Sequence, residues 1–264
     1  MTKCNRETLK SKRENVLYCN GFIWDGNGKL LDYTDDDGVN YHYAQYNTRP
    51  VIDCPFRSAG CEKVCYATKG NHVFPSVKES RGKSYMETKR ADFGYAVAYT
   101  IKTEKESKRY KNAVMIVRIH ESGDFYSLQY LKKWVMAWKE LETLDGVLFV
   151  FYTKSFPFFL MLDDVEIDLI NRMIDGGKMA INLSVDDTTT DEQWRALFEL
   201  KKRIPKANIY RCAENVENVE HDNVCDCANC AKCGTCNHGT GKTTVVKIHS
   251  ASENDMKAYR ANIK

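Results

Sequence analysis

The sequence lacks the features that mark membrane, secreted and strongly basic proteins. It contains no apolar run of about 18 residues, so we expect no membrane-spanning helix. Its N-terminus leads into no apolar signal-peptide core, so we expect a chain that stays in a reducing cytoplasm. There is little charge excess, because 39 Lys and Arg residues stand against 36 Asp and Glu, for a net charge of +3. This composition does not indicate wholesale binding of nucleic-acid phosphates.

Cysteine, by contrast, is abundant and unevenly distributed. The chain has 264 residues and 11 cysteines, and none of them lies between Cys65 and Cys212. In a reducing compartment we expect cysteines to bind metal or do chemistry rather than form disulfides. They divide into a group of three (Cys54, Cys61, Cys65), a group of five (Cys225, Cys227, Cys230, Cys233, Cys236) and three that stand apart (Cys4, Cys19, Cys212).

Between the two cysteine groups, the hydrophobic pattern alternates between strand and helix. The strands are apolar on both faces, which is typical of a parallel sheet covered by helices. A full eight-fold barrel needs roughly 250 residues, so we predict an α/β fold of the partial, open TIM-like β/α barrel type, with five or six strands. Strands are predicted at 113–119, 147–152, 179–185 and 208–212, and helices at 85–104, 128–141, 164–175 and from a capping box at 190–193 to Pro205.

The composition predicts three parts along the chain. Residues 1–50 form an N-terminal appendage with weak strand signals at 16–23 and 41–46. Residues 51–212 form the partial barrel, which begins with the first cysteine group and in which Ile52 can belong to a further strand. Residues 213–264 form a cysteine-rich C-terminal extension.

The first cysteine group has the spacing Cys-x6-Cys-x3-Cys in a predicted loop. Thiolates are soft ligands, suited to zinc or to iron–sulfur clusters. Structural zinc takes four ligands, so three close cysteines leave a zinc site one ligand short. On a four-iron cluster the same three cysteines leave one iron open for a substrate or cofactor. We favour the open [4Fe–4S] cluster, with zinc completed by His72 or a distant cysteine, or thiols without metal, as the alternatives.

The second cysteine group places five cysteines within residues 225–236. Bacterial ferredoxins use a similarly tight run for a four-iron cluster, whereas a zinc ribbon separates its two cysteine pairs by 12 or more residues. We therefore favour a second cluster over zinc, held by Cys230, Cys233 and Cys236 with either Cys225 or Cys227. The following Gly239–Thr243 looks like the end of a phosphate-binding loop, but the glycine that the motif requires at position 236 is a cysteine.

Polar side chains follow three of the predicted strands. Ser122-Gly123-Asp124 comes directly after the strand at 113–119. Because the carboxyl ends of parallel strands face the ligand side, we expect a shared pocket in which Asp124 can hold an ammonium or hydroxyl group. The alternative is a tight turn in which Asp124 caps a helix. The candidate catalytic residues of this pocket are His120, Glu121, Lys154 and Asp186, and Ser184 lies beside the last of them.

Together these motifs resemble the radical S-adenosylmethionine (radical SAM) superfamily, and more closely uncharacterised phage-encoded radical-SAM-like proteins. The resemblance covers roughly residues 50–236 and is carried by CPFRSAGCEKVCYA at 54–67, RIHESGDFYS at 118–127 and YTKS at 152–155. It implies a [4Fe–4S] cluster on the first cysteine group, with S-adenosylmethionine on its open iron, and an auxiliary C-terminal cluster. It also implies that Ser122-Gly123-Asp124 contacts the methionine amino group, that Tyr66 fills an aromatic position, and that Ser184 contacts ribose or carboxylate.

Three functions therefore stand as hypotheses. The first is an iron–sulfur enzyme of the radical SAM type, acting on an unknown substrate and served by a reductant protein. The second is a zinc-stabilised phage protein that binds nucleic acid or a host factor. The third is an enzyme that uses an open [4Fe–4S] iron as a Lewis acid without radical chemistry. We expect each in the host cytoplasm, and the second would use a basic face made of Lys78, Arg81, Lys83, Lys89 and Arg90.

Overall fold

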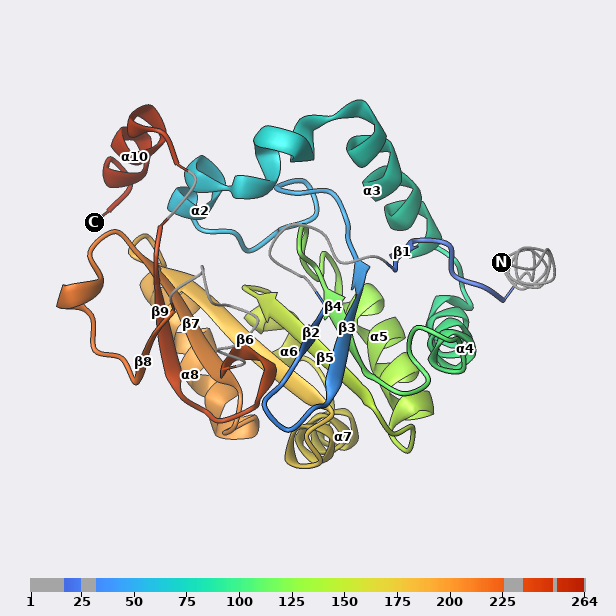
Figure 1. The fold of residues 1–264 in the computed structure, drawn as a ribbon. Helices are drawn as coiled ribbons and strands as arrows, with labels where there is room; N and C mark the ends of the chain where they lie inside the picture. Colours follow the sequence, from blue (N-terminus) through green and yellow to red (C-terminus); the bar gives the residue numbers. More distant parts are fainter. Residues whose placement is uncertain (1–16, 25–31, 226–234, 249–250, 264) are drawn as a thin grey trace.

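The computed structural model describes residues 17–24, 32–225, 235–248 and 251–263. They form a mixed α/β structure around one mostly parallel sheet (Figure 1). The sheet order is β1-β3-β4-β5-β6-β7-β9-β8, and β2 pairs with β3. The strands are β1 (Phe22–Ile23), β2 (Tyr33–Thr34), β3 (Asn40–Tyr46), β4 (Val114–Ile119), β5 (Val147–Thr153), β6 (Met179–Asp186), β7 (Asn208–Ala213), β8 (Asn223–Cys225) and β9 (Thr243–Lys247).

Helices cover one face of this sheet and its carboxyl end. Helices α4 to α8 pack their apolar sides on the sheet, while α2 and α10 contact each other above its end (Figure 1). The helices are α2 (Ala59–Val64), α3 (Pro75–Glu87), α4 (Phe93–Lys105), α5 (Leu128–Leu141), α6 (Phe156–Leu160), α7 (Asp164–Asp175), α8 (Asp191–Arg203) and α10 (Glu253–Arg260). The short 3-10 turns are η1 (Tyr66–Thr68), η2 (Gly70–Val73), η3 (Val216–Asn218) and η5 (Thr235–Asn237).

The six strands β3, β4, β5, β6, β7 and β9 run parallel to one another. Strand β8 adds to the free edge of β9, also in parallel, and β1 and β2 pair antiparallel with β3. The predicted α/β class with a parallel sheet is therefore confirmed. The domain boundaries at 50 and 212 stay predictions, although β3 and β9, which lie outside them, are strands of the same sheet.

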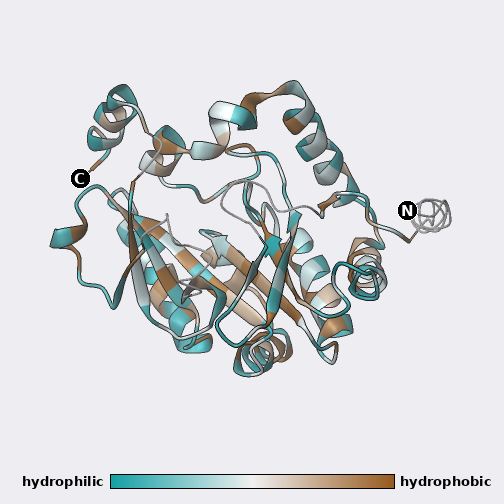
Figure 2. Ribbon diagram, in the orientation of Figure 1, coloured by the Kyte–Doolittle hydropathy of each residue, from teal (hydrophilic) through white to brown (hydrophobic). Residues whose placement is uncertain are grey.

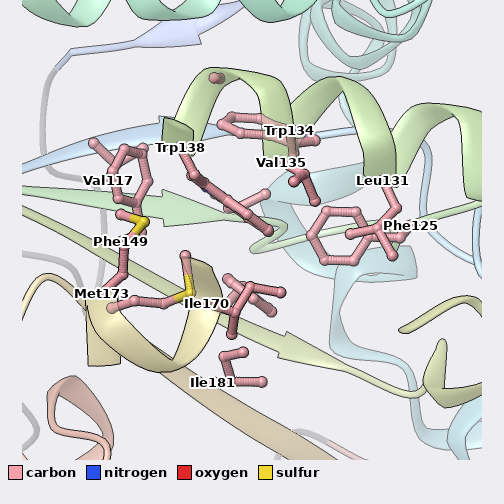
Figure 3. Packing of buried hydrophobic residues seen from close by; sticks show 14 of the residues in the cluster. Val117, Phe125, Leu131, Trp134, Val135, Trp138, Phe149, Ile170, Met173 and Ile181 are labelled. Atoms are coloured by element: carbon pink, nitrogen blue, oxygen red, sulfur yellow. The ribbon is translucent and has the colours of Figure 1, made fainter. Parts of the chain in front are cut away.

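Successive side chains along each strand point to opposite faces of the sheet. One face is covered by helices, and the other carries a smaller apolar cluster. In β4, Val117 and Ile119 pack with the helices, whereas Ile116 joins a smaller cluster on the opposite face. On the helix side, the Trp138 ring stacks on Phe151 with centroids 5.6 Å apart, within the core shown in Figure 3. Both faces of the central strands β5 and β6 are buried, which is why their sequences read as apolar runs.

Hydropathy follows the same division. Figure 2 shows hydrophobic residues along the central strands, while α3 and α10 are mostly hydrophilic. Thr190 caps α8 and Gln193 bonds back to it, so the predicted capping box is confirmed. Within the described residues, no helix combines the length and apolar composition needed to cross a bilayer.

The single helix predicted at 85–104 is wrong, because the chain forms α3 and α4 with a break between them. The Thr88 hydroxyl donates to the Tyr85 carbonyl at 2.6 Å, a bond that competes with helix continuation. Lys133 on α5 donates to the Thr88 and Arg90 carbonyls, each at 2.7 Å. These carbonyls are satisfied by a distant lysine, so the helix ends there.

Two further expectations at the N-terminal side are corrected by the structure. Ile52 does not belong to a strand but lies in a turn, with 71% of its side chain exposed. The strand expected at 16–23 is reduced to the two residues of β1 within its described part. The weak signal at 41–46, in contrast, corresponds to the full-length strand β3.

Candidate functional site

A cavity of about 780 Å³ opens at the carboxyl end of the parallel strands. Small-molecule sites typically measure about 300–1,000 Å³. All six parallel strands contribute to its lining, as do the loops after β3 and β4. Of the residues predicted from the sequence, it is lined by Cys54, Cys61, Cys65, Tyr66, His120, Glu121, Ser122, Gly123, Asp124, Lys154, Ser184, Asp186, Cys225 and Cys236.

The first cysteine group is carried by the loop after β3 and by α2. The Cys54 amide donates to the Val51 carbonyl at 3.2 Å in a turn. Val51 has a φ of 64°, a left-handed backbone that is a strained conformation for a β-branched residue. Cys61 and Cys65 are four residues apart along α2 and its end, so they lie on one side of it.

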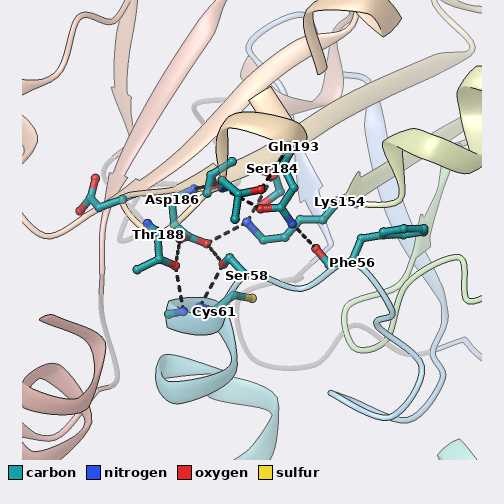
Figure 4. A network of polar contacts seen from close by, with 12 residues as sticks. Phe56, Ser58, Cys61, Lys154, Ser184, Asp186, Thr188 and Gln193 are labelled. Carbon is teal, nitrogen blue, oxygen red and sulfur yellow. Dashed lines mark hydrogen bonds and ion pairs between the residues drawn. The ribbon is translucent and has the colours of Figure 1, made fainter. Parts of the chain in front are cut away.

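The N-terminus of α2 is anchored to the end of β6 through Ser58 (Figure 4). The Ser58 side chain caps the helix by accepting from the Cys61 amide at 3.2 Å. Its hydroxyl donates to the Asp186 carboxylate, and the Gly60 amide donates to the Thr188 hydroxyl at 2.8 Å. The cysteine loop is therefore held directly by a predicted catalytic residue.

Asp186 also forms a buried ion pair with Lys154, at 2.8 Å between Nζ and Oδ2. The two side chains are 9% and 3% exposed. Burial lowers the pKa of Lys154, but the negative charges of Asp186 and a Cys61 thiolate outweigh it, so the pKa ends above its ordinary value. Burial raises the pKa of Asp186 and Lys154 lowers it, with a net decrease. Both groups are therefore charged at neutral pH.

The Ser122-Gly123-Asp124 loop is attached to the chain that leads into the cysteine loop. The Thr48 amide donates to the Ser122 carbonyl at 3.0 Å, and the Ser122 hydroxyl donates back to the Thr48 carbonyl at 2.8 Å. Gly123 has a φ of 85°, and a Cβ on it would lie 1.9 Å from the Thr48 hydroxyl oxygen. Only glycine fits there, both for its backbone conformation and for space.

Asp124 joins the ends of β4 and β5. Its carboxylate accepts from the Thr153 hydroxyl at 2.7 Å and from the Lys154 and Phe125 amides at 2.9 and 2.7 Å. Burial raises its pKa to about 6, although these donors act in the opposite direction. Asp124 thus has a positioning role, and it also lines the cavity, with the Lys154 amide as the donor to its Oδ2.

His120 and Glu121 begin this loop. His120 has a φ of 62°, and its Nε2 lies 2.9 Å from the Tyr130 hydroxyl while its buried Nδ1 has no partner. Burial, and then the charge of Arg118, lower the pKa of His120 to about 3, so the ring is neutral. The Tyr66 hydroxyl donates to the Glu121 carbonyl, which ties the cysteine loop to this one as well.

The described part of the second cysteine group lines the same cavity. Cys225 in β8 and Cys236 in η5 both contribute to it. Asp186, Cys212, Val246 and Cys225 occupy one row across β6, β7, β9 and β8. Cys212, which the sequence pattern set apart, therefore lies on the cavity floor. Cys4, Cys227, Cys230 and Cys233 lie outside the described residues.

The three thiols of the first group lie near one another at the cavity. Burial raises the pKa of each of them, that of Cys61 to about 11, and the thiolates of Cys61 and Cys65 further raise that of Cys54. The three sulfurs are thus close enough to interact. However, no three His, Cys, Asp or Glu side chains of the described residues are grouped closely enough to hold one metal ion.

Sequence reasoning missed several residues of the site, above all Arg118. It is a charged residue within an apolar strand, at a position whose alternation places it on the cavity side with Ile116. Tyr152 and Tyr210 have the same orientation on β5 and β7. Charged and aromatic residues at every second position of a buried strand were the signal available for them.

Of the five residues suggested for a basic face around α3, Arg81 is not on the surface, whereas Lys78, Lys83 and Lys89 are exposed. Arg81 is only 4% exposed, and its guanidinium donates to the Ala67 carbonyl at 3.2 Å and lies 2.7 Å from His72 Nδ1. It supports the cysteine loop from inside the protein. His72, the alternative zinc ligand, lines the cavity beside it.

Fold and site together define a mixed α/β protein with two cysteine-bearing segments over one cavity at the carboxyl end of a parallel sheet. The chain belongs to the Gene product 88 family, whose family model matches residues 22–239. It is 27% identical over 174 residues to the Gene 88 protein of Mycobacterium phage D29, a match that covers 60% of this chain and 70% of that protein. No solved structure matches the chain.

Proposed function

We propose that this protein is an iron–sulfur enzyme of the radical SAM type, encoded by a phage and active in the host cytoplasm. In this proposal β3, β4, β5, β6, β7 and β9 are the six strands of a partial, open TIM-like barrel. The observation that carries the proposal is the meeting of Cys54, Cys61 and Cys65 with the Ser122–Asp124 loop in one cavity at the strand ends. The cofactors would be a [4Fe–4S] cluster and S-adenosylmethionine.

The residues of the chain divide the work of holding such a cofactor. Cys54, Cys61 and Cys65 would ligate the cluster, which supplies an open iron and an electron for reductive cleavage of S-adenosylmethionine. Asp124 presents a carboxylate oxygen to an ammonium group, and Gly123 lets the backbone approach closely. Ser184 lines the cavity one strand further along.

Lys154 and Asp186 have a supporting role in this arrangement. Lys154 places a positive charge near Cys61 and lowers the cost of a thiolate there, because burial alone would disfavour it. Asp186 fixes that ammonium and, through Ser58, the helix that carries the cysteine. The Lys154–Asp186 pair thus influences both the charge of the Cys61 sulfur and the position of the helix that carries it.

The C-terminal cysteines would hold an auxiliary cluster that faces the same cavity. Support for this comes from Cys225 and Cys236, which line the cavity together with the first group. A cluster on that side can pass electrons to the first or anchor the substrate. An external reductant protein would be the electron source.

The test is anaerobic purification and reconstitution with iron and sulfide. We expect about four irons and four acid-labile sulfides for the first site, and release of 5′-deoxyadenosine from S-adenosylmethionine upon reduction. Cys54→Ser, Cys61→Ser and Cys65→Ser should each abolish that release. Cys19→Ser is the matched control, because Cys19 is buried away from the cavity, where its thiol donates to Glu87 at 2.8 Å.

Two outcomes would replace the proposal with another. Stoichiometric zinc without acid-labile sulfide would favour the zinc-stabilised binding protein. A reconstituted cluster that never cleaves S-adenosylmethionine would remove radical chemistry and favour the Lewis-acid enzyme.

A further inference from the structure

Among the described residues, Arg118 is the cation of the cavity that has no carboxylate partner. Its side chain lines the cavity, and its buried Nε has no hydrogen-bond partner. No carboxylate of the described residues forms an ion pair with it. The other lysines and arginines that line the cavity are all paired in the described part of the chain, Arg57 with Glu62 at 2.7 Å, Lys69 with Asp255 at 2.6 Å and Lys154 with Asp186 at 2.8 Å.

The Arg118 guanidinium lies against the Tyr152 ring, which is in turn in contact with Tyr210. Its central carbon lies 3.9 Å from the Tyr152 ring centroid, and Tyr152 meets Tyr210 edge-on at 4.6 Å. Stacking uses the face of the guanidinium and leaves its in-plane N–H groups free to donate. An arginine held in this way is suited to two coplanar oxygens of a carboxylate or phosphate.

The acidic residues around the cavity do not occupy this cation. Asp124 accepts hydrogen bonds from Thr153 and Lys154 at the end of β5, and Asp186 accepts from the Lys154 ammonium and from its own loop. Glu121 receives a bond from the Asn47 amide at 3.4 Å. An incoming anion at Arg118 would thus replace no carboxylate partner from the described part of the chain.

Arg118 lies within β4, deeper in the sheet than the polar loop that begins at His120. It precedes His120 by two residues on β4, which is about 7 Å along a strand, and it lies on the aromatic floor of the cavity. We propose that Arg118 binds a carboxylate or phosphate of the substrate, while Tyr152 and Tyr210 contact a flat part of the same molecule. This assignment of a substrate class rests on the proposed function for the reaction itself, but not for the binding.

The experiment measures binding to the full chain as purified, without added iron or S-adenosylmethionine. Isothermal titration calorimetry compares phenyl phosphate, benzoate and the uncharged benzamide. We expect at least one anion to bind roughly ten-fold or more tightly than benzamide, the ratio typical of a charge-assisted hydrogen bond. Arg118→Gln should abolish that preference. Arg118→Lys should lose most of that preference, because an ammonium lacks the planar arrangement of N–H donors of a guanidinium. This variant provides the test if Arg118→Gln fails to fold.

Arg172→Gln is the charge-matched control. Arg172 lies on α7 and pairs with Glu142 at 2.7 Å outside the cavity, so anion affinity should not change. Preference for phenyl phosphate would assign a phosphate group to the substrate, and preference for benzoate a carboxylate. Equal affinity for anion and amide in the wild type, or unchanged anion binding in both Arg118 variants, overturns the inference.

The cofactor provides the remaining check. If the Arg118 variants lose S-adenosylmethionine binding but keep their anion preference, Arg118 belongs to the cofactor site and the inference is wrong. Conversely, anion binding that depends on Arg118 in a protein that releases no 5′-deoxyadenosine refutes the proposed reaction alone.

Discussion

Removal of the Lys154 ammonium tests whether the buried pair at the strand ends holds the site together. Lys154→Met keeps the length and apolar stem of the side chain but leaves Asp186 without its countercharge. The Asp186 carboxylate would still accept from the Ser58 hydroxyl and from the Thr188 amide and hydroxyl. The side chain of Asp186 is only 3% exposed, so water compensates poorly for the lost ammonium.

The expected cost follows from that burial. Removing one partner of a buried pair typically costs about 3–5 kcal/mol. Three neutral donors remain on Asp186, which argues for the lower end, about 3 kcal/mol. With a urea dependence of about 3 kcal/mol/M, this shifts the unfolding midpoint by about 1 M.

A double-mutant cycle separates the pair from its surroundings. Urea unfolding, followed by tryptophan fluorescence, would be measured for Lys154→Met, Asp186→Asn and the double variant. We expect each single change to lower the free energy of unfolding by about 3 kcal/mol and the double change to lower it by about 4 kcal/mol. The costs do not add because each single variant leaves one buried charge without its partner, whereas the double variant leaves no buried charge. Costs that simply add, or a loss below about 0.5 kcal/mol for Lys154→Met, would refute the reasoning.

Two further predictions concern the loop after β4. Gly123→Ala should lower the free energy of unfolding in urea by at least about 1 kcal/mol more than Gly177→Ala. Both glycines have a positive φ, but only at position 123 would a Cβ press against Thr48. Equal losses of stability in the two variants would show that this contact does not matter. His120→Gln should flatten the pH dependence of stability. The pKa of His120 is about 3 in the folded protein against an ordinary 6.5, so its contribution to the free energy of unfolding is fully present above pH 6.5 and is lost as pH falls towards 3. Between pH 7 and pH 5 this loss is about 2 kcal/mol. Parallel pH profiles of stability for the wild type and the variant would contradict this.

Local patterns were sufficient to predict most of the sheet and its covering helices. The helix at 128–141 and the strand at 147–152 depend on their own apolar periodicity and on Gly146 between them, and the structure has them within one residue. The break between α3 and α4 was missed because the carbonyls of Thr88 and Arg90 accept hydrogen bonds from Lys133, which lies more than 40 residues later. No local signal in the segment 85–104 reports that contact.

The candidate site shows the same limit. Cysteine spacing and the polar strand ends were enough to predict which segments meet. They did not place Cys212 or Arg118 in the cavity. Alternation within β4 indicates that Arg118 shares a face with Ile116, but the residues that lie beside Arg118 and Cys212 follow from strand pairing, which a single sequence does not state.

Backbone strain occurs at one non-glycine residue in each of the two loops of the candidate site, the cysteine loop after β3 and the loop after β4. Val51 and His120 both adopt a left-handed backbone, which costs of the order of 1–3 kcal/mol each and persists only where surrounding contacts enforce it. The enforcing contacts are visible: the His120 amide donates to the Tyr46 carbonyl at 2.8 Å, and the Asp124 amide donates to the Asp53 carbonyl at 3.0 Å. These bonds join the chain leading to the first cysteine with the loop after β4. The cysteine loop is therefore positioned by the protein's own hydrogen bonds, so a cofactor would meet a site already arranged for it.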